Sequence, residues 1–265
     1  MKQTLKRAIA GTPLEPFLRR VHDYAGTRPI VAHLQARLGD NSRLYDLQTL
    51  QVMRKVLKAD SNCIDVGCHR GAILKEMLAL APEGHHYGFE PLPDLLEGLK
   101  VRFAAEPRVH LRAEALSDVQ GSATFQHVVD QPGYSGLRKR RYATPDARTV
   151  EIEVQTARLD ELIPGDRDIR FIKIDVEGAE LQVLRGAAGL IGRCRPIIVF
   201  EHGLGAADYY GTEPEQVHDL LAGELGLSIG LMGDWLAGRR EKFLSRTAFG
   251  EEFRQARNFY FIASP

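Results

Sequence analysis

The stretch CIDVGCHRGAILKEML, residues 63–78, constrains the fold of this chain more than any other part of the sequence. A short apolar run meets Gly67 and Gly71, and apolar residues at helical spacing follow, which predicts a strand, a tight turn and a helix. Glycine can adopt positive φ and lets a ligand approach the backbone. The dinucleotide fingerprint needs three glycines and this turn has two, so a nicotinamide dehydrogenase is the weaker alternative.

Acidic residues follow the first two predicted strands. Asp65 stands at the end of the first strand, and the second, HHYGFE at residues 85–90, ends in Glu90. Ligands of open α/β sheets bind at the carboxyl ends of the strands, and an acid about 20 residues after the glycine turn is placed to bind ribose hydroxyls. Because a carboxylate at Asp65 suits an amino-bearing or cationic ligand, the pair predicts S-adenosylmethionine. The alternative is an ordinary turn with surface acids.

Composition narrows the class of protein. The 265 residues are 44% hydrophobic, enough for one packed domain with a small extension. Lys plus Arg and Asp plus Glu each number 35, so bulk charge does not favour nucleic-acid binding. Three cysteines without zinc or disulfide spacing favour a reducing compartment. With no signal peptide or membrane span visible, we expect a cytoplasmic protein acting on a small molecule or glycan, and leave a homo-oligomer open.

Residues 1–59 are predicted to form a helical extension before a main domain at residues 60–265. Prolines at positions 13, 16 and 29 interrupt the helical pattern, and a last helix is predicted from about residue 43 to residue 58. This extension either packs on the domain or forms part of a substrate lid. The residues expected on the buried face of its last helix are Leu44, Leu47, Leu50, Met53 and Leu57.

The middle of the chain predicts a helix at residues 94–105, a third strand at 109–118 and a β insertion. The insertion comprises alternating segments at residues 122–130 and 150–162. The turn of Leu116, Ser117 and Asp118 is either a hairpin turn or a site for the adenine edge. A long loop at residues 131–146 carries a basic run at 138–141, which is either solvated or a clamp for an acidic or phosphorylated acceptor.

A second informative stretch, RFIKIDVEGAELQVLRGA at residues 170–187, predicts a buried strand that ends at Asp175 and a following helix. Glu177 comes two residues later, and the next strand, at 196–200, ends at Glu201 and His202. Asp175, Glu177 and His202 are candidates to orient or deprotonate an acceptor hydroxyl, with His69 weaker and His202 alternatively structural. A metal held by Asp175, Glu177, Glu201 and His202 is a further alternative. A helix at residues 213–225 and strands at 227–232 and 258–263 complete the prediction.

Residues 60 to about 203 resemble the FkbM-type methyltransferases. The resemblance rests on CIDVGCHRG, GFEPLP, EALSD, TARLDEL, FIKIDVEGAELQVLRGA and IIVFEH. It implies a Rossmann-like, doubly wound, mostly parallel sheet of the class I methyltransferase type. It also implies S-adenosylmethionine-dependent O-methylation of a hydroxyl on a sugar, glycan, or glycosylated or polyketide-type metabolite. Alternatives are an N-methyltransferase on a small molecule and a catalytically silent nucleoside-binding module.

The resemblance also implies roles for individual residues. The residues expected to bind the cofactor are Asp65, Gly67, His69, Gly71 and Glu90, with the turn at residues 116–118 near the adenine. His69, in the same glycine turn, departs from the family, which often has asparagine there. Asp175 and Glu177 fall on the family's acidic motif.

Overall fold

The computed structural model describes residues 42–142 and 146–265, and the chain divides into two compact units, residues 1–49 and 50–265. The predicted helices around Pro13, Pro16 and Pro29 lie outside the described residues. The last predicted helix is α4, Ser42–Val56. The predicted leucines of α4 are only half-buried, and its buried side chains are Tyr45, Thr49, Val52 and Met53. The boundary after residue 59 and the role of the extension stay predictions.

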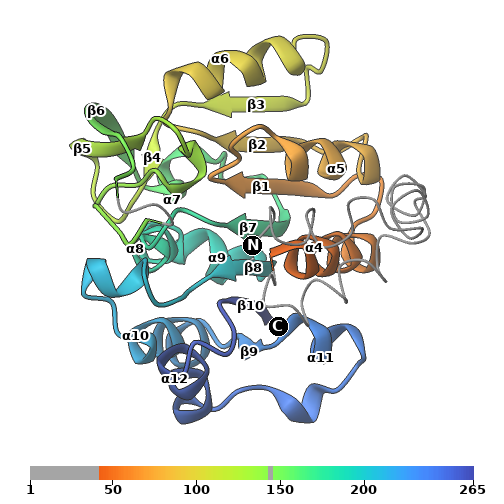
Figure 1. Cartoon of the computed structure of the whole chain (residues 1–265). Helices are drawn as coiled ribbons and strands as arrows, with labels where there is room; N and C mark the ends of the chain where they lie inside the picture. The colour runs from red at the N-terminus through yellow and green to blue at the C-terminus, as the bar shows by residue number, and fades with distance from the viewer. Residues whose placement is uncertain (1–41, 143–145) are drawn as a thin grey trace, which may run out of the picture. The chain divides into compact units, whose positions relative to one another are not determined.

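Within the described residues, the main sheet has seven strands in the order β3-β2-β1-β7-β8-β10-β9 (Figure 1). All neighbouring strands are parallel except that β10 runs antiparallel to β8 and β9. This confirms the predicted α/β class, a doubly wound and mostly parallel sheet that ends in a closing pair of strands. The strands are β1 Asn62–Val66, β2 His86–Phe89, β3 Val109–Arg112, β7 Ile169–Ile174, β8 Ile197–Glu201, β9 Ser228–Gly230 and β10 Tyr260–Ser264.

The middle positions of the central strands are mostly apolar because both faces of the sheet are covered. The register pairs Ile64 with Ile172 and Val66 with Ile174, so these four side chains share one face and one hydrophobic core. Asp65 and Lys173 are the exception, a polar pair at matching positions of β1 and β7. They share the opposite face, and both are buried.

Helices connect the strands. The helix predicted at residues 94–105 begins one residue early, at Pro93, where proline suits the first turn. The helix predicted after Gly178 is divided in two at Ala187. Within the described ranges, no helix is long and apolar enough to cross a lipid bilayer. The helices are α5 Ala72–Leu80, α6 Pro93–Arg102, α7 Leu159–Leu162, α8 Glu180–Gly186, α9 Ala188–Cys194, α10 Pro214–His218 continued by a π-helical turn at Asp219–Glu224, α11 Met232–Leu236 and α12 Arg246–Arg254, with short 3-10 turns at Pro132–Tyr134, Ala207–Tyr210 and Arg240–Lys242.

The predicted third strand, residues 109–118, is in fact two strands in two sheets. Its partner β2 ends at Phe89, which pairs with Arg112, so the chain has no further strand to pair with in the main sheet. It continues as β4, Ala115–Leu116, in a three-stranded sheet of order β4-β6-β5. Strands β5 Gly121–Val128 and β6 Thr149–Ala157 form the predicted β insertion as an antiparallel pair.

The turn after β4 is fixed by close packing. The Ser117 N–H donates to the Ala157 carbonyl oxygen at 2.9 Å, which continues the β4–β6 pairing. Gly186 ends α8 against the same turn, where the Cβ of any larger residue would come within 2.0 Å of the Ser117 carbonyl oxygen. The absence of a side chain at Gly186 therefore sets how closely α8 approaches the insertion.

We expect Gly186→Ala to lower the free energy of unfolding by about 1–3 kcal/mol, since the added methyl meets backbone that cannot move without breaking the β4–β6 pairing. The measurement is urea denaturation at constant slope. The matched control is Gly192→Ala in α9, an exposed position where the new Cβ meets the Leu225 side chain only at 3.9 Å. Higher helix propensity should stabilise that variant by up to about 1 kcal/mol. Equal transition midpoints for the two variants would contradict the packing argument.

Candidate active site

The candidate active site lies where the strand order reverses. From β1 the chain proceeds to β2 and β3 on one side, and from β7 it proceeds to β8 on the other, so β1 and β7 flank the switch point. In open α/β sheets, ligands bind outside the carboxyl ends of the strands at such a point. Asp65 is near the end of β1 and Asp175 directly follows β7. The topology thus brings together the two stretches singled out in the sequence.

The glycine turn after β1 packs directly against the end of β7. Gly67 has φ 73°, and a Cβ there would lie 1.9 Å from the Asp175 carbonyl oxygen. The Gly67 and Cys68 N–H groups both donate to the Phe89 carbonyl oxygen at 3.0 Å. Gly71, with φ 70°, begins α5 where a side chain would collide with Leu99. Both positions require glycine, for conformation and for space.

Glu90 holds the glycine turn in place. Its Oε2 accepts a 2.9 Å hydrogen bond from the His69 N–H, and its Oε1 accepts one of 3.0 Å from the Leu92 N–H. Glu90 is 5% exposed, and this burial raises the pKa of its carboxyl. His69 has φ 48°, a conformation in which histidine, like asparagine, is enriched. The backbone of His69, rather than its ring, makes the bond to Glu90.

The carboxylate of Asp65 is buried and poorly hydrogen-bonded, with a weak backbone interaction from Leu74. It is 1% exposed, and among the described residues neither oxygen accepts a hydrogen bond of normal geometry. Its cationic neighbour is Lys173, whose Nζ lies 3.9 Å from Asp65 Oδ1. Burial raises the pKa of Asp65 to about 6, against the opposing effect of Lys173. An ionised Asp65 therefore lacks donors that a bound ligand could supply.

Lys173 connects Asp65 to Asp175. Its Nζ lies 3.0 Å from Asp175 Oδ2 and donates to the Gly67 carbonyl oxygen at 3.4 Å. Burial alone would lower the Lys173 pKa, but the carboxylates of Asp175 and Asp65 raise it above its ordinary value. This residue was not among those predicted from the sequence. A lysine between two isoleucines of a buried strand was the signal that could have found it.

Asp175 is held by groups from three other positions. Its Oδ2 accepts a 2.6 Å hydrogen bond from the Tyr260 hydroxyl, and its carboxylate also shares a hydrogen bond with Glu201. Burial alone would raise the Asp175 pKa, but Lys173 and these hydrogen bonds lower it to about 2. Burial, followed by the charge of Asp175, raises the Glu201 pKa. These opposite pKa shifts favour an ionised Asp175 beside a protonated Glu201.

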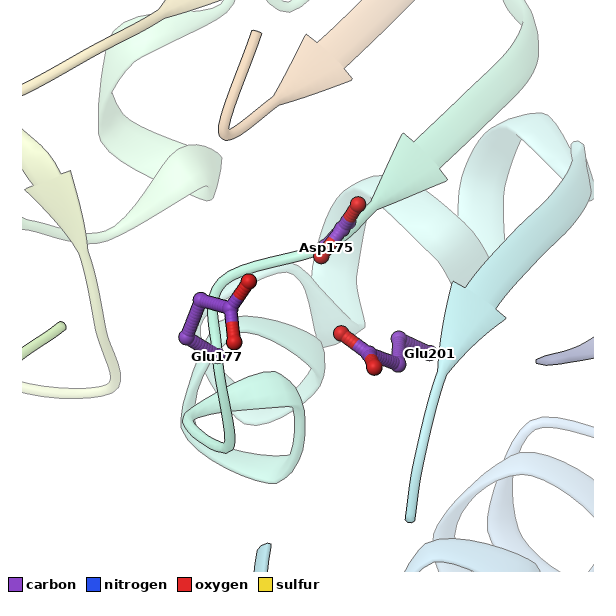
Figure 2. A group of neighbouring side chains, drawn as sticks. All are labelled: Asp175, Glu177 and Glu201. Carbon is purple, nitrogen blue, oxygen red and sulfur yellow. The ribbon is translucent and has the colours of Figure 1, made fainter. Parts of the chain in front are cut away.

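The turn from Asp175 into α8 has an unusual backbone that Glu180 stabilises. Glu177 has φ 61°, a strained conformation for a residue other than glycine. Gly178 has φ 114°, and a Cβ there would lie 2.7 Å from the Ala206 backbone. The buried Glu180 side chain accepts hydrogen bonds from the Val176 and Gly178 N–H groups at 3.2 and 3.0 Å. With its backbone N–H groups bonded to Glu180, this turn directs the Glu177 side chain toward Asp175 and Glu201 (Figure 2).

Three carboxylates converge on one space, those of Asp175, Glu177 and Glu201. One oxygen of each lies within 4.8 Å of the others (Figure 2). Such a group could surround a divalent cation. Two of its members already have cationic partners, because Lys173 contacts Asp175 and Arg140 forms an ion pair with Glu177. His202, the fourth ligand of the predicted metal alternative, is not part of the group.

His202 lies in the hydrophobic core. Its ring is 0% exposed and stacks on Phe253 and Phe249, with ring centroids 4.8 and 5.8 Å apart. Among the described residues neither ring nitrogen has a hydrogen-bond partner, and burial lowers the pKa to about 3. An imidazole in this environment is a poor proton acceptor. Its placement favours the structural alternative.

The basic loop is attached to the site rather than free in solvent. The Arg140 guanidinium pairs with Glu177, donates to the Gly205 carbonyl oxygen at 3.2 Å and lies over the Tyr134 ring at 5.2 Å. The Arg138 N–H donates to the Tyr210 hydroxyl at 2.9 Å. Residues 131–142 therefore contact both the Glu177 turn and the segment after β8.

The turn at residues 116–118 packs on α8 and β6. Leu116 is buried in the main core, and the Ser117 hydroxyl donates to Asp118 Oδ1 at 3.3 Å. The adenine role of this turn stays a prediction.

Comparison with known proteins identifies the family. Residues 65–226 match the model of the methyltransferase FkbM domain. The chain is 28% identical over 152 residues to methyltransferase sdnD of Sordaria araneosa, an alignment that covers 46% of this chain and 59% of that protein.

Two solved structures are also similar. The first is the crystal structure of methyltransferase FkbM from Methylobacillus flagellatus KT, with TM-score 0.50 and 15% identity over 82% of this chain and 47% of that one. The second is precorrin-6y C5,15-methyltransferase from Geobacter metallireducens GS-15, with TM-score 0.40 and 12% identity over 70% and 73% of the two chains. The chain spans about half to three-fifths of the length of sdnD and of the Methylobacillus protein. The family model covers more than half of this chain, and the chain belongs to the FkbM methyltransferase family.

Proposed function

We propose that this protein is an S-adenosylmethionine-dependent O-methyltransferase that acts on a hydroxyl of a sugar, a glycan, or a glycosylated or polyketide-type metabolite. The observation that carries the proposal is the buried Asp65 carboxylate at the switch point of an FkbM-family sheet, where neither oxygen accepts a hydrogen bond of normal geometry from the residues that the structure describes. A buried acceptor of this kind is completed by a ligand with amino or hydroxyl donors.

The residues at this edge of the sheet fit the proposed cofactor. Gly67 shapes the turn after β1, and Asp65 and Glu90 offer carboxylate oxygens at the ends of neighbouring strands. Asp65 suits an amino group, and Glu90 retains lone pairs for ribose hydroxyls beside its two backbone bonds. Bound there, S-adenosylmethionine would supply an electrophilic methyl group on its sulfonium.

Asp175 is the proposed group that orients the acceptor hydroxyl and takes its proton. Lys173 and Tyr260 hold its carboxylate as an anion. A low pKa is compatible with this role, because a hydroxyl oxygen that gains a methyl group makes its proton strongly acidic. Glu177 and Glu201 add acceptor oxygens within 4.8 Å, which suits an acceptor carrying several hydroxyls. The ion pairs of Asp175 with Lys173 and of Glu177 with Arg140 favour a reaction without a metal ion.

We expect calorimetry to detect binding of S-adenosylhomocysteine, with Asp65→Asn and Glu90→Gln weakening it by about 1–3 kcal/mol through lost charge-assisted hydrogen bonds. The pKa of Asp65 is about 6 in the free protein, and a bound amino group would lower it. Binding then releases a proton at acidic pH, so affinity should fall as the pH drops from 8 to 5, by at most about tenfold per unit.

The control for cofactor binding is Glu83→Ala, an exposed acid before β2 at the opposite edge of the sheet. It should bind like the wild type, and Asp65→Asn should show a flatter pH dependence. Tight binding of NAD with no response to S-adenosylhomocysteine would refute the proposed cofactor.

We expect the loop at residues 131–142 to be an acceptor lid that Arg140 holds closed. Arg140→Gln should increase chymotrypsin cleavage at Tyr134 and Tyr142 several-fold, because the ion pair to Glu177 and the bond to Gly205 are lost. Lys139→Gln, at an exposed neighbouring position, is the control and should cleave like the wild type. Cofactor and acceptor together should protect the wild-type loop. Equal cleavage with and without both ligands would mark the loop as passive.

We expect a mass-spectrometric screen of sugar nucleotides, glycans and glycosylated metabolites, run with methyl-deuterated S-adenosylmethionine, to give a product labelled on oxygen. With that acceptor, Asp175→Asn should lower kcat by about 100-fold or more while S-adenosylhomocysteine binds normally. His202→Phe keeps the stacked aromatic shape and should retain turnover.

Other results of the acceptor screen would each favour a different assignment. A label on nitrogen would favour the N-methyltransferase alternative, and cofactor binding without any product would favour a silent binding module. Inhibition by a chelator that magnesium reverses would assign a metal to the carboxylates. Loss of cofactor binding in Asp175→Asn, with full turnover at saturation, would make Asp175 a cofactor residue.

A further inference from the structure

Tyr260 reaches the switch point from the last strand of the chain. Strand β10 is antiparallel to β8, so its first residue lies at the edge where the parallel strands end. The register pairs Tyr260 with Glu201, and the Tyr260 hydroxyl donates to Asp175 Oδ2 across 85 positions of sequence. The strand has no part in the residues that carried the family resemblance or in the 65–226 family match.

Tyr260 and Lys173 both contact the same oxygen of Asp175. Tyr260 Oη lies 2.6 Å from Oδ2, and Lys173 Nζ lies 3.0 Å from it. Two donors on Oδ2 restrict rotation of the carboxylate and leave Oδ1 for other partners. Glu177 and Glu201 have oxygens within 4.8 Å of an Asp175 oxygen, so the Asp175 carboxylate borders the space where the three acids converge (Figure 2).

The two donors have different consequences. Lys173 also contacts Asp65, so its charge serves both ends of the site. The Tyr260 hydroxyl is neutral, so its hydrogen bond helps to orient the Asp175 carboxylate without adding charge to the site. Its short distance is typical of a hydroxyl that donates to an ionised carboxylate.

We propose that Tyr260 is a positioning residue for methyl transfer, which acts by orienting the Asp175 carboxylate so that one oxygen faces the acceptor hydroxyl. This inference rests on the proposed function, in which Asp175 contacts the acceptor. It assigns the antiparallel strand β10 a role in the site besides closing the sheet. A misoriented carboxylate leaves cofactor binding intact but places the acceptor oxygen poorly for an in-line displacement.

The experiment compares Tyr260→Phe with Tyr87→Phe, a tyrosine of β2 whose ring stacks on His110. The proteins are labelled with ¹³C at the aspartate carboxyl carbon, and the Asp175 resonance is assigned by its absence in Asp175→Asn. At neutral pH, Tyr260→Phe should shift that resonance and Tyr87→Phe should not. Both variants should bind S-adenosylhomocysteine within about twofold of the wild type, since neither contacts Asp65 or Glu90 in the described structure.

Methyl transfer to the acceptor found in the screen supplies the second readout. Tyr260→Phe should lower kcat by about 10- to 100-fold and leave the KM for S-adenosylmethionine unchanged. In the Asp175→Asn background the same substitution should cost nothing further, because its effect passes through Asp175.

Three results would overturn the inference: an unmoved Asp175 resonance in Tyr260→Phe, wild-type kcat in that variant, or multiplicative losses in the double variant. The NMR measurement needs no acceptor, so it tests the inference even if the screen identifies no acceptor. Failure of the wild-type protein to bind S-adenosylhomocysteine would refute the proposed function instead, and it is measured separately.

Discussion

The ammonium of Lys173, held between the carboxylates of Asp65 and Asp175, is the interaction on which this site depends. Strand register places Lys173 beside Asp65 in the sheet, and chain direction places Asp175 two residues further. Without a cation between them, the buried carboxylates of Asp65 and Asp175 would repel each other, and nothing would compensate for their lost hydration. A buried lysine is equally unfavourable without anions. Each of the three charges is therefore retained because of the others.

Close backbone contact locks the two strand ends together. The missing side chain of Gly67 allows the carbonyl of Asp175 to approach, and the Asp175 N–H donates to Val66. Glu180 then satisfies the amides of the following turn, which lets Glu177 adopt a strained backbone conformation. The glycine turn that is proposed to bind the cofactor therefore packs directly against the turn that directs the proposed acceptor carboxylates. A change in the backbone of one turn is expected to shift the other.

Segments distant in sequence complete the site around this centre. Arg140 comes from the loop between β5 and β6, and Tyr260 comes from the antiparallel strand β10. Each pairs with one carboxylate of the convergent group, Arg140 with Glu177 and Tyr260 with Asp175. The motifs of β1 and β7 thus supply the acidic groups, while the insertion and the final strand supply donors that set their charge and direction.

The sequence by itself determined the fold class, the strand–turn–helix at residues 63–78, the β insertion and the closing strands. These follow from local periodicity and from glycines whose conformation has no substitute. It also identified Asp65, Glu90, Asp175 and Glu177 as strand-end acids, because the carboxyl ends of parallel strands meet at one edge. Their roles in binding and catalysis stay proposals.

Tertiary structure decided which polar groups meet. The sequence predicts His202 as a site residue because it follows Glu201. Successive residues of an extended chain face opposite ways, however, and the His202 ring packs on Phe249 and Phe253. The local pattern marks Lys173 as an unusual residue of a buried strand, but its partners and the arrival of Tyr260 depend on strand register and direction. The third strand ended early because its partner β2 ended, a limit set by a neighbour rather than by the strand's own residues.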